Sequence, residues 1–286
     1  MKSYKLNIII IILISLSHLS CNDSEICNIS VHTTNGGSAT ISNYEIINGG
    51  LVTLTAKPEQ GYIFKGWSIN GMTISSKNPY TTEINSDVQF TANFESIYAP
   101  TGYNNGYGYI DLGLSVKWAT CNIGASNPEE RGKLYAWGET KPKSYYDWQT
   151  YKWCNGNSYT INKYWYSDNK LYLDIEDDAA NFAWGSNWRM PTKKEIEELL
   201  VHCIITSDVM NGATGFTITN PKTNKSIFLP AIGSISNTKT ACYYWSSSLN
   251  ENNFCHAYMM YVYYSSGINI KDISRASGFN IRPVCE

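Results

Sequence analysis

The stretch Cys255-His-Ala-Tyr-Met-Met-Tyr-Val-Tyr-Tyr264 carries the strongest strand signal in the second half of the chain. Successive side chains of a strand point to opposite faces of a sheet. One face of this strand would carry His256, Tyr258, Met260, Val262 and Tyr264, and the other Ala257, Met259, Tyr261 and Tyr263. Because both faces are largely apolar, the pattern predicts a central strand that is buried on both sides.

Two helices are expected on the N-terminal side of this strand. Thr192 and Glu195 form a capping box, which marks a helix start. An apolar stripe follows at helical spacing and consists of Ile196, Leu199, Leu200 and Cys203. A shorter helix is predicted from Asp177 or Asp178 to Ala183, ended by Gly185. Most of the remaining sequence from 108 to 286 has the pattern of short strands and long irregular loops.

The first half of the chain carries strand and turn signals but no helical stripe. The pairs Asn35-Gly36, Asn48-Gly49 and Asn70-Gly71 are typical of tight hairpin turns, since they supply positive φ angles. Between the turns, apolar residues alternate at period two in 51–56 and 88–94. These features predict a small all-β unit.

The N-terminus has the pattern of a secretion signal, with basic Lys2 and Lys5 followed by a short aliphatic run. We assign 1–20 to the signal peptide and 21–26 to a polar tether. Cys21 at the cleavage point resembles the lipidation site of bacterial lipoproteins, although His18 replaces the usual aliphatic residue. The acidic tether is similar to Bacteroides-group export signals, which implies a surface-exposed outer membrane lipoprotein. Ordinary secretion, with Cys21 a leftover residue, is the alternative.

The composition limits the classes of partner. The chain has 286 residues, a formal net charge of −2 and no basic run, so nucleic acid is an unfavourable partner. Aromatic residues make up 14% of the chain and charged residues 16%. Tyr and Trp combine an apolar face with a hydrogen-bonding edge, which suits recognition of sugars or proteins.

The first unit resembles a divergent InlB B-repeat. The resemblance is carried by Gly50-Leu-Val-Thr-Leu-Thr-Ala-Lys-Pro58, Gly61-Tyr-Ile-Phe-Lys-Gly-Trp67, Asn78-Pro-Tyr80 and Phe90-Thr-Ala-Asn-Phe94. It implies a β-grasp-like spacer domain of a bacterial surface protein over residues 27–95. The Pro-, Gly- and Asn-rich residues 96–107 are expected to be a linker. We expect Tyr62, Phe64 and Trp67 to be core residues.

The second unit, residues 108–286, resembles the Fibrobacter succinogenes major paralogous domain. The resemblance is carried by 111–125, Tyr135-Ala-Trp-Gly-Glu-Thr140, Asp177-Asp-Ala-Ala180, Trp188-Arg-Met-Pro-Thr192, Ile227-Phe-Leu-Pro-Ala231, Tyr244-Trp-Ser-Ser-Ser248 and Ile281-Arg-Pro-Val284. It implies a C-type-lectin-like fold related to the formylglycine-generating enzyme. The expected fold class of the whole chain is therefore α+β, with two helices, short sheets and long loops behind a small all-β domain. Trp118, Trp137, Trp188 and Trp245 lie in these segments and are expected in the core.

Catalytic motifs of the common hydrolase and nucleotide-binding types are absent from the sequence. The formylglycine-generating enzyme uses a pair of cysteines, and Cys242, Cys255 and Cys285 lie in the comparable third of the chain. None of them has that enzyme's motif around it, and a shared fold does not confer activity. We therefore expect no enzyme activity and no cofactor, with an oxidase as the open alternative.

An acidic cluster precedes the shorter helix and consists of Asp174, Glu176, Asp177 and Asp178. Such oxygen atoms could bind calcium. Capping and favourable charge at a helix N-terminus also explain these acids, so no metal site is assigned.

Ligand binding is assigned to the rings of a loop-rich region, which could stack on sugar faces. They are Tyr145, Tyr146, Trp148, Tyr151, Trp153, Tyr164, Trp165 and Tyr166. The resulting hypothesis is a non-catalytic, lipid-anchored surface protein that recognises a glycan, another extracellular polymer or an extracellular protein. The third alternative is a structural component of a surface or fimbrial assembly.

Overall fold

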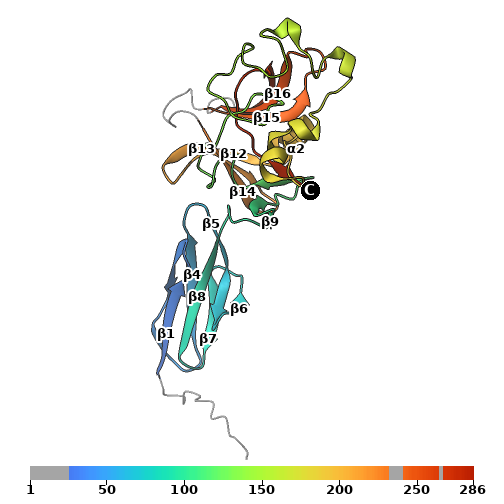
Figure 1. Cartoon of the computed structure of the whole chain (residues 1–286). Coiled ribbons are helices and arrows are strands. Elements are labelled where there is room, and N and C mark those ends of the chain that lie inside the picture. Colours follow the sequence, from blue (N-terminus) through green and yellow to red (C-terminus); the bar gives the residue numbers. More distant parts are fainter. Residues whose placement is uncertain (1–25, 232–240, 264–266) are drawn as a thin grey trace, which may run out of the picture. The chain divides into compact units, whose positions relative to one another are not determined.

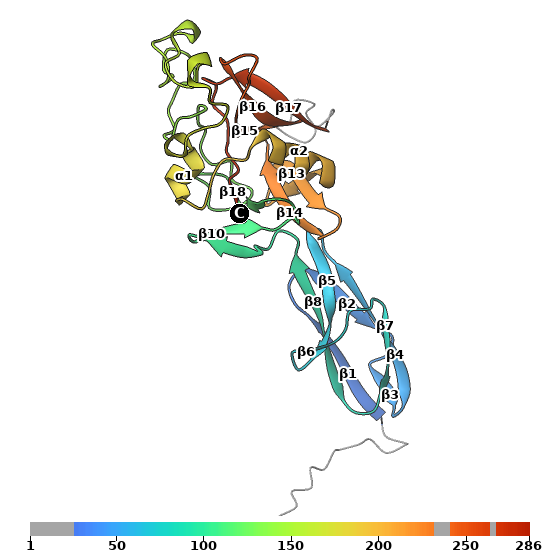
Figure 2. The same cartoon turned by 90° about the vertical axis from the view of Figure 1, so that its right-hand side faces the viewer.

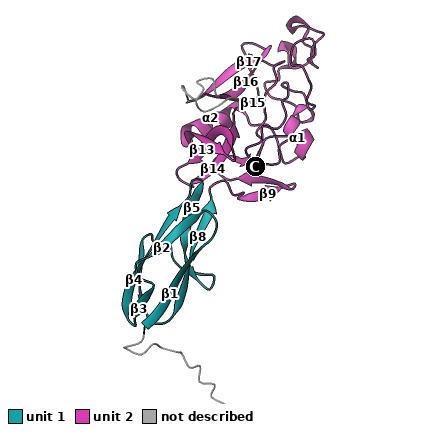
Figure 3. Cartoon of the chain, turned by 90° about the vertical axis from the view of Figure 1, so that its left-hand side faces the viewer, with its two compact units in different colours: residues 1–96 teal, residues 97–286 magenta. Residues whose placement is uncertain are grey.

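The computed structural model describes residues 26–231, 241–263 and 267–286 (Figure 1). The predicted signal peptide and Cys21 lie outside these residues. The chain divides into two compact units, with the boundary between Ser96 and Ile97 (Figure 3). Among the described helices, none is both long and apolar enough to cross a membrane.

The described part of the first unit, residues 26–96, consists of strands and turns. The strands are β1 (Ile26–Thr33), β2 (Gly37–Ile41), β3 (Glu45–Ile47), β4 (Gly50–Pro58), β5 (Tyr62–Ile69), β6 (Met72–Ser75), β7 (Tyr80–Ile84) and β8 (Val88–Ser96). They form a five-stranded sheet in the order β3-β1-β8-β5-β6 and a three-stranded sheet in the order β2-β4-β7. In the larger sheet β1 and β8 are parallel.

The two sheets of the first unit share one hydrophobic core. In β4, Val52 and Leu54 are fully buried while Leu51 is 64% exposed, so the alternation at period two separates core from solvent. Trp67 is fully buried as expected, and Tyr62 and Phe64 pack against the same core half-buried.

The turn between β5 and β6 shows why the Asn-Gly signal is informative. Asn70 and Gly71 both have positive φ angles, 49° and 80°. This backbone conformation suits the twist of a two-residue hairpin, and Asn and Gly tolerate it best. The hairpin predicted at this position is confirmed.

The described residues of the second unit form strands, two α-helices and three short 3-10 helices. The strands are β9 (Gly102–Asn104), β10 (Tyr107–Ile110), β11 (Lys117–Ala119), β12 (Ile204–Met210), β13 (Ala213–Asn220), β14 (Lys225–Pro230), β15 (Ala241–Leu249), β16 (His256–Tyr263), β17 (Gly267–Ser274) and β18 (Val284–Cys285). The helices are η1 (Ser158–Thr160), η2 (Tyr166–Asp168), η3 (Ile175–Asp177), α1 (Ala179–Trp184) and α2 (Lys193–His202).

Three small sheets organise the second unit, in the orders β18-β11-β10-β9, β12-β13-β14 and β15-β16-β17 (Figure 2). Strand β16 is central in its sheet, as predicted. Met260 and Val262 on one face contribute to a core with α2 and the β12–β14 sheet, whereas Ala257 and Met259 on the other contribute to a second core. The four tryptophans expected in the core, at 118, 137, 188 and 245, are all fully buried.

Both predicted helices are confirmed. The Thr192 hydroxyl accepts a hydrogen bond from Glu195 N, and the Glu195 side chain accepts one from Thr192 N, which completes the capping box of α2. Asp178 is the N-cap of α1, and Gly185 ends it with a φ of 94°.

The α+β class predicted for the chain is wrong. Of the described residues, 46% lie in strands or bridges and 10% in helices, so the protein is mostly β with many small sheets. The first unit has a pair of sheets and, within residues 26–96, no helix of the β-grasp kind. Residues 96–107, predicted as a linker, include β9 and belong from Ile97 onward to the second unit, where β9 pairs with β10.

Candidate functional site

The eight rings assigned to ligand binding differ widely in exposure. Tyr145 is 74% exposed and Tyr166 58%, whereas Tyr151 and Tyr164 are buried. The other four, Tyr146, Trp148, Trp153 and Trp165, are half-buried. Two of the eight rings are therefore exposed, and the other six are buried or half-buried.

Tyr151 and Tyr164 support the long loop from inside. The Tyr151 hydroxyl donates to Trp137 O at 2.8 Å, and the Tyr164 hydroxyl donates to Asp177 Oδ2 at 2.7 Å. Burial raises the pKa of both phenols. These two rings are structural and cannot stack on a ligand at the surface.

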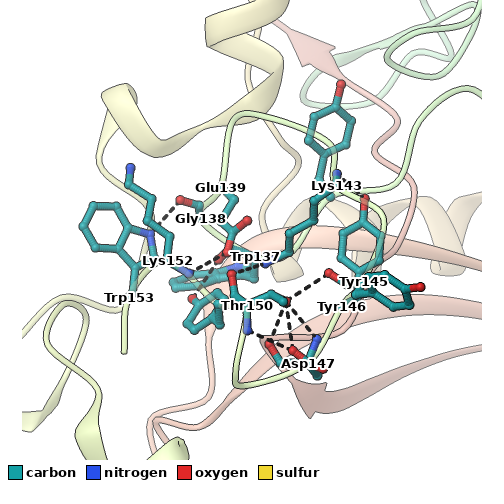
Figure 4. A network of polar contacts seen from close by, with 12 residues as sticks. Trp137, Gly138, Glu139, Lys143, Tyr145, Tyr146, Asp147, Thr150, Lys152 and Trp153 are labelled. Carbon is teal, nitrogen blue, oxygen red and sulfur yellow. Dashed lines mark hydrogen bonds and ion pairs between the residues drawn. The ribbon is translucent and has the colours of Figure 1, made fainter. Parts of the chain in front are cut away.

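Two of the half-buried rings, Tyr146 and Trp153, belong to a network of polar contacts (Figure 4). Buried Glu139 accepts hydrogen bonds from Lys143 Nζ at 2.9 Å and from Lys152 N at 2.8 Å. Trp153 Nε1 donates to Gly138 O at 2.7 Å, and Lys152 Nζ lies 3.9 Å from a Trp153 ring centroid. Because the lysine covers this ring, Trp153 is a poor stacking platform.

Three of the four acids of the acidic cluster pair with lysines. Carboxylate oxygens of Asp174, Glu176 and Asp177 lie within 4.8 Å of one another, close enough to hold a cation. Lys163 Nζ contacts all three carboxylates, at 3.1 Å from Asp174 and 3.6 Å from Glu176. Its ammonium group supplies the positive charge that a metal ion would otherwise supply.

A cleft of about 640 Å³ lies beside α1, within the second unit. Segments that are distant in sequence line it: β9, the chain before and after α1, the start of α2, β15 and β18. The lining residues are Asn104, Tyr172, Leu173, Ile175, Asp178, Asn181, Ser186, Asn187, Trp188, Arg189, Met190, Thr192, Ser247, Cys285 and Glu286. None of the eight rings assigned from the sequence is among them.

Backbone hydrogen bonds fix the aromatic wall of the cleft. Leu173 N donates to Ser247 O at 3.1 Å, and Leu249 N donates to Leu171 O at 2.8 Å, so residues 171–173 are held against β15. Between them Tyr172 is 50% exposed, and nearby Ile175 is 61% exposed. A rigid segment thus presents an aromatic and an aliphatic side chain to the cleft.

Asp178 connects the start of α1 to the chain segment that precedes α2, at the cleft. Its carboxylate accepts hydrogen bonds from Ala180 N, Asn181 N and Met190 N, at 2.8, 3.2 and 2.8 Å. Burial raises the pKa of the Asp178 carboxyl, against the lowering effect of these hydrogen bonds. Since these donors occupy the carboxylate, Asp178 is a structural part of the wall.

Arg189 is the one cation among the described residues that line the cleft, and it is already paired. Its guanidinium contacts both oxygens of Glu195, at 2.8 and 2.6 Å, and Glu286 Oε1 at 2.9 Å. Burial raises the pKa of Glu195, but the hydrogen bonds from Arg189 and Thr192 outweigh it and hold the pKa below its usual value.

Uncharged polar groups complete the cleft. Asn187 Nδ2 donates to Asn104 Oδ1 at 3.2 Å, and the Asn181 amide donates to Gly185 O and Trp188 O. The amide oxygens of Asn181 and Asn187 have no hydrogen-bond donor among the described residues, and the Ser186 hydroxyl has no partner there. These three groups are available to a ligand.

The sequence contained one signal for this cleft. The segments 177–180 and 188–192, which carry part of the resemblance of the second unit, contribute Asp178, Trp188, Arg189, Met190 and Thr192 to its wall. Tyr172, Asn104 and Glu286 carried no signal, because only the folded chain brings them together.

Comparison with known proteins identifies part of the chain. Residues 27–98 match the family described as divergent InlB B-repeat domain, as the sequence predicted. A domain of this kind suggests a surface-associated protein. No curated protein matches the chain. No solved structure matches it either.

Proposed function

We propose that the second unit is a non-catalytic recognition domain that binds a glycan or another extracellular polymer in the cleft beside α1. The observation that carries this proposal is the combination of an exposed Tyr172 ring with the free polar groups of Asn181, Ser186 and Asn187. Ligand pockets typically pair an apolar or aromatic wall with a few polar groups that fix orientation.

The chemistry of the cleft suits a saccharide. Amide and hydroxyl groups match the hydroxyls of a sugar as donors and acceptors. The ring of Tyr172 offers an apolar face to the C–H face of a sugar and a hydroxyl at its edge. The aromatic loop residues, by contrast, are proposed to support the fold, except for the exposed Tyr145 and Tyr166.

Membership of the second unit in the Fibrobacter succinogenes major paralogous family is part of the proposal. Its support is that the quoted segments supply buried parts of the unit, with Trp118, Trp137, Trp188 and Trp245 fully buried. The burial of these tryptophans supports the family resemblance of the quoted segments. It does not change the fold class, which is mostly β.

We further propose that lipid on Cys21 anchors the protein to the outer membrane, with the first unit as a spacer. The support is the sequence of residues 1–26 and the InlB B-repeat match. Intact mass of the mature protein from its native envelope tests the anchor. We expect cleavage before Cys21 with an added acyl mass, lost in Cys21→Ala; an unmodified Cys21 contradicts it.

An oxidase that uses two cysteines is less consistent with the thiols. Burial raises the pKa of Cys242, Cys255 and Cys285, which disfavours the reactive thiolate. A structural role in a surface assembly predicts a different outcome: co-purifying subunits and no soluble ligand.

Binding to a glycan array, with wild type and two variants, tests the recognition proposal. Tyr172→Ala removes the aromatic wall and should weaken binding about 5-fold or more, since truncating a central aromatic residue of a binding site removes about 1 kcal/mol or more. Tyr159→Ala is the matched control, because Tyr159 is 93% exposed and does not line the cleft. It should bind like wild type.

Two results would contradict the proposal. One is wild-type protein, correctly folded, that binds no glycan and no extracellular polymer. The other is equal loss of binding in Tyr172→Ala and Tyr159→Ala, which would place the ligand elsewhere.

A further inference from the structure

We infer that the cleft selects uncharged saccharides and discriminates against anionic ones such as uronates, sialates and sulfated sugars. This inference rests on the proposed function and adds the ligand class. It is based on how the charged groups at the cleft are already paired.

Arg189 is the group that an anionic sugar would need. Proteins bind carboxylate and sulfate groups through bidentate contacts to a guanidinium. Here both terminal nitrogens of Arg189 already contact Glu195, and Nη2 also contacts Glu286. Nη1 has a further, longer contact with Met190 O at 3.3 Å. To make a bidentate contact with the guanidinium, a sugar carboxylate would have to displace one of these two glutamates.

The other charges of the cleft are negative. Asp178 is 5% exposed and its carboxylate is occupied by three backbone N–H groups. The Glu286 side chain is 80% exposed, with one oxygen paired to Arg189. The lining therefore carries two carboxyl groups against one cation, and Glu195 adds a further negative charge beside Arg189. This balance disfavours an anionic ligand through like-charge repulsion.

Apart from the second carboxylate oxygen of Glu286, the groups left for a ligand are uncharged. They are the Asn181 and Asn187 amide oxygens, the Ser186 hydroxyl and the Tyr172 side chain. Sugar hydroxyls can donate to the two amide oxygens and can both donate to and accept from Ser186. The amide oxygens would face an anion with partial negative charge, which also favours a neutral partner.

The test is an array that carries neutral gluco-, galacto- and N-acetylhexosamine oligosaccharides beside uronate-, sialate- and sulfate-bearing ones. The proteins are wild type, Glu286→Gln and the control Glu83→Gln. Glu83 is an exposed residue of β7 in the first unit, so both variants change the net charge equally.

We expect wild type and Glu83→Gln to bind neutral glycans in preference to anionic ones. Glu286→Gln weakens one partner of Arg189, so binding of anionic glycans should rise by up to about fivefold, the range of an exposed ion pair. The ratio of anionic to neutral binding should therefore rise in Glu286→Gln and stay at the wild-type value in Glu83→Gln.

The remaining outcomes distinguish failure of the charge-selectivity inference from failure of the proposed recognition function. Wild-type binding that favours anionic glycans, or a Glu286→Gln variant that gains no anionic binding relative to Glu83→Gln, overturns the inference and leaves the recognition function intact. Folded wild-type protein that binds no glycan overturns the inference, and it overturns the recognition function as well if it also binds no other extracellular polymer.

Discussion

Arg189 joins three parts of the second unit through one guanidinium. It follows Trp188 in the cleft wall, contacts Glu195 in the first turn of α2 and contacts Glu286 beside β18. Charge-assisted, bidentate contacts of this kind are among the stronger hydrogen bonds in proteins. The ion pair between Arg189 and Glu195 is thus expected to stabilise the cleft wall as well as to set its charge.

The first prediction concerns Glu195→Gln. Glutamine keeps the capping box with Thr192 but loses the charge that pairs with Arg189, so stability should fall by about 1 to 3 kcal/mol at pH 7. The pKa of Glu195 is lowered in the folded protein. Its contribution is therefore fully present above its unfolded pKa and lost as pH falls through the folded pKa.

Urea unfolding of wild type and variant at pH 7 and near pH 3 measures this effect. The difference between the two proteins should shrink at the lower pH, since pH 3 lies below the usual glutamate pKa of the unfolded chain, about 4.3, and the stabilisation is lost as pH falls toward the lowered folded pKa. Glu197→Gln is the control on the same helix; its contact with Lys193 is 3.9 Å and half-exposed, so it should change stability by about 0.5 kcal/mol or less. A Glu195→Gln effect that is independent of pH would contradict the assigned ion pair.

The exposure of single rings in the long loop could not be predicted from the sequence. Tyr145 and Tyr151 lie six positions apart in the same Tyr- and Trp-rich stretch, yet one is 74% and the other 3% exposed. No local pattern separates them, because the burial of Tyr151 depends on contacts with Trp137 and Arg275. Both residues lie outside the Tyr- and Trp-rich stretch. The cleft was not predicted for the same physical reason, because only the folded chain brings its lining residues together.

Helices and strands differed in how well they could be predicted. The starts of α1 and α2 depend on Asp178 and Thr192, whose capping contacts are local and therefore visible in sequence. Strand β13 has four consecutive buried residues, Gly215 to Ile218, so the period-two alternation of a half-buried strand is missing. Strands of this kind account for the mostly β character that the α+β prediction missed.

The second prediction concerns the buried face of α2. Ile196 is fully buried in the core that includes Phe216 and Met260, so Ile196→Ala should lower stability by about 2 to 5 kcal/mol. Val201→Ala on the same helix should stay within about 0.5 kcal/mol, because Val201 is 76% exposed. Equal effects of the two substitutions in urea unfolding would contradict the assigned helix orientation.

At the scale of the whole molecule, each unit has a hydrophobic core of its own. The core with Trp67 and Phe90 draws only on the first unit, and the cores around Trp118, Trp137 and Trp188 draw only on the second. The InlB B-repeat was predictable because its turns and alternating strands are local, and its bounds, 27–98, agree closely with the unit.

The third prediction is that residues 26–98 fold alone. Trp67 is the one tryptophan of this segment in the sequence, and its full burial makes its fluorescence a specific reporter. We expect a cooperative unfolding transition with a red shift of the emission. A gradual, non-cooperative change, or exposed Trp67 in the absence of denaturant, would contradict an independent unit.

The most direct test of the central claim is a map of amide chemical-shift changes in the isotope-labelled protein, recorded with the strongest glycan from the array. We expect the largest changes at residues 172–190 and at Cys285 and Glu286, with little change at Tyr145, Tyr159 and Tyr166. Changes concentrated at those three exposed tyrosines, with an unaffected cleft, would contradict it.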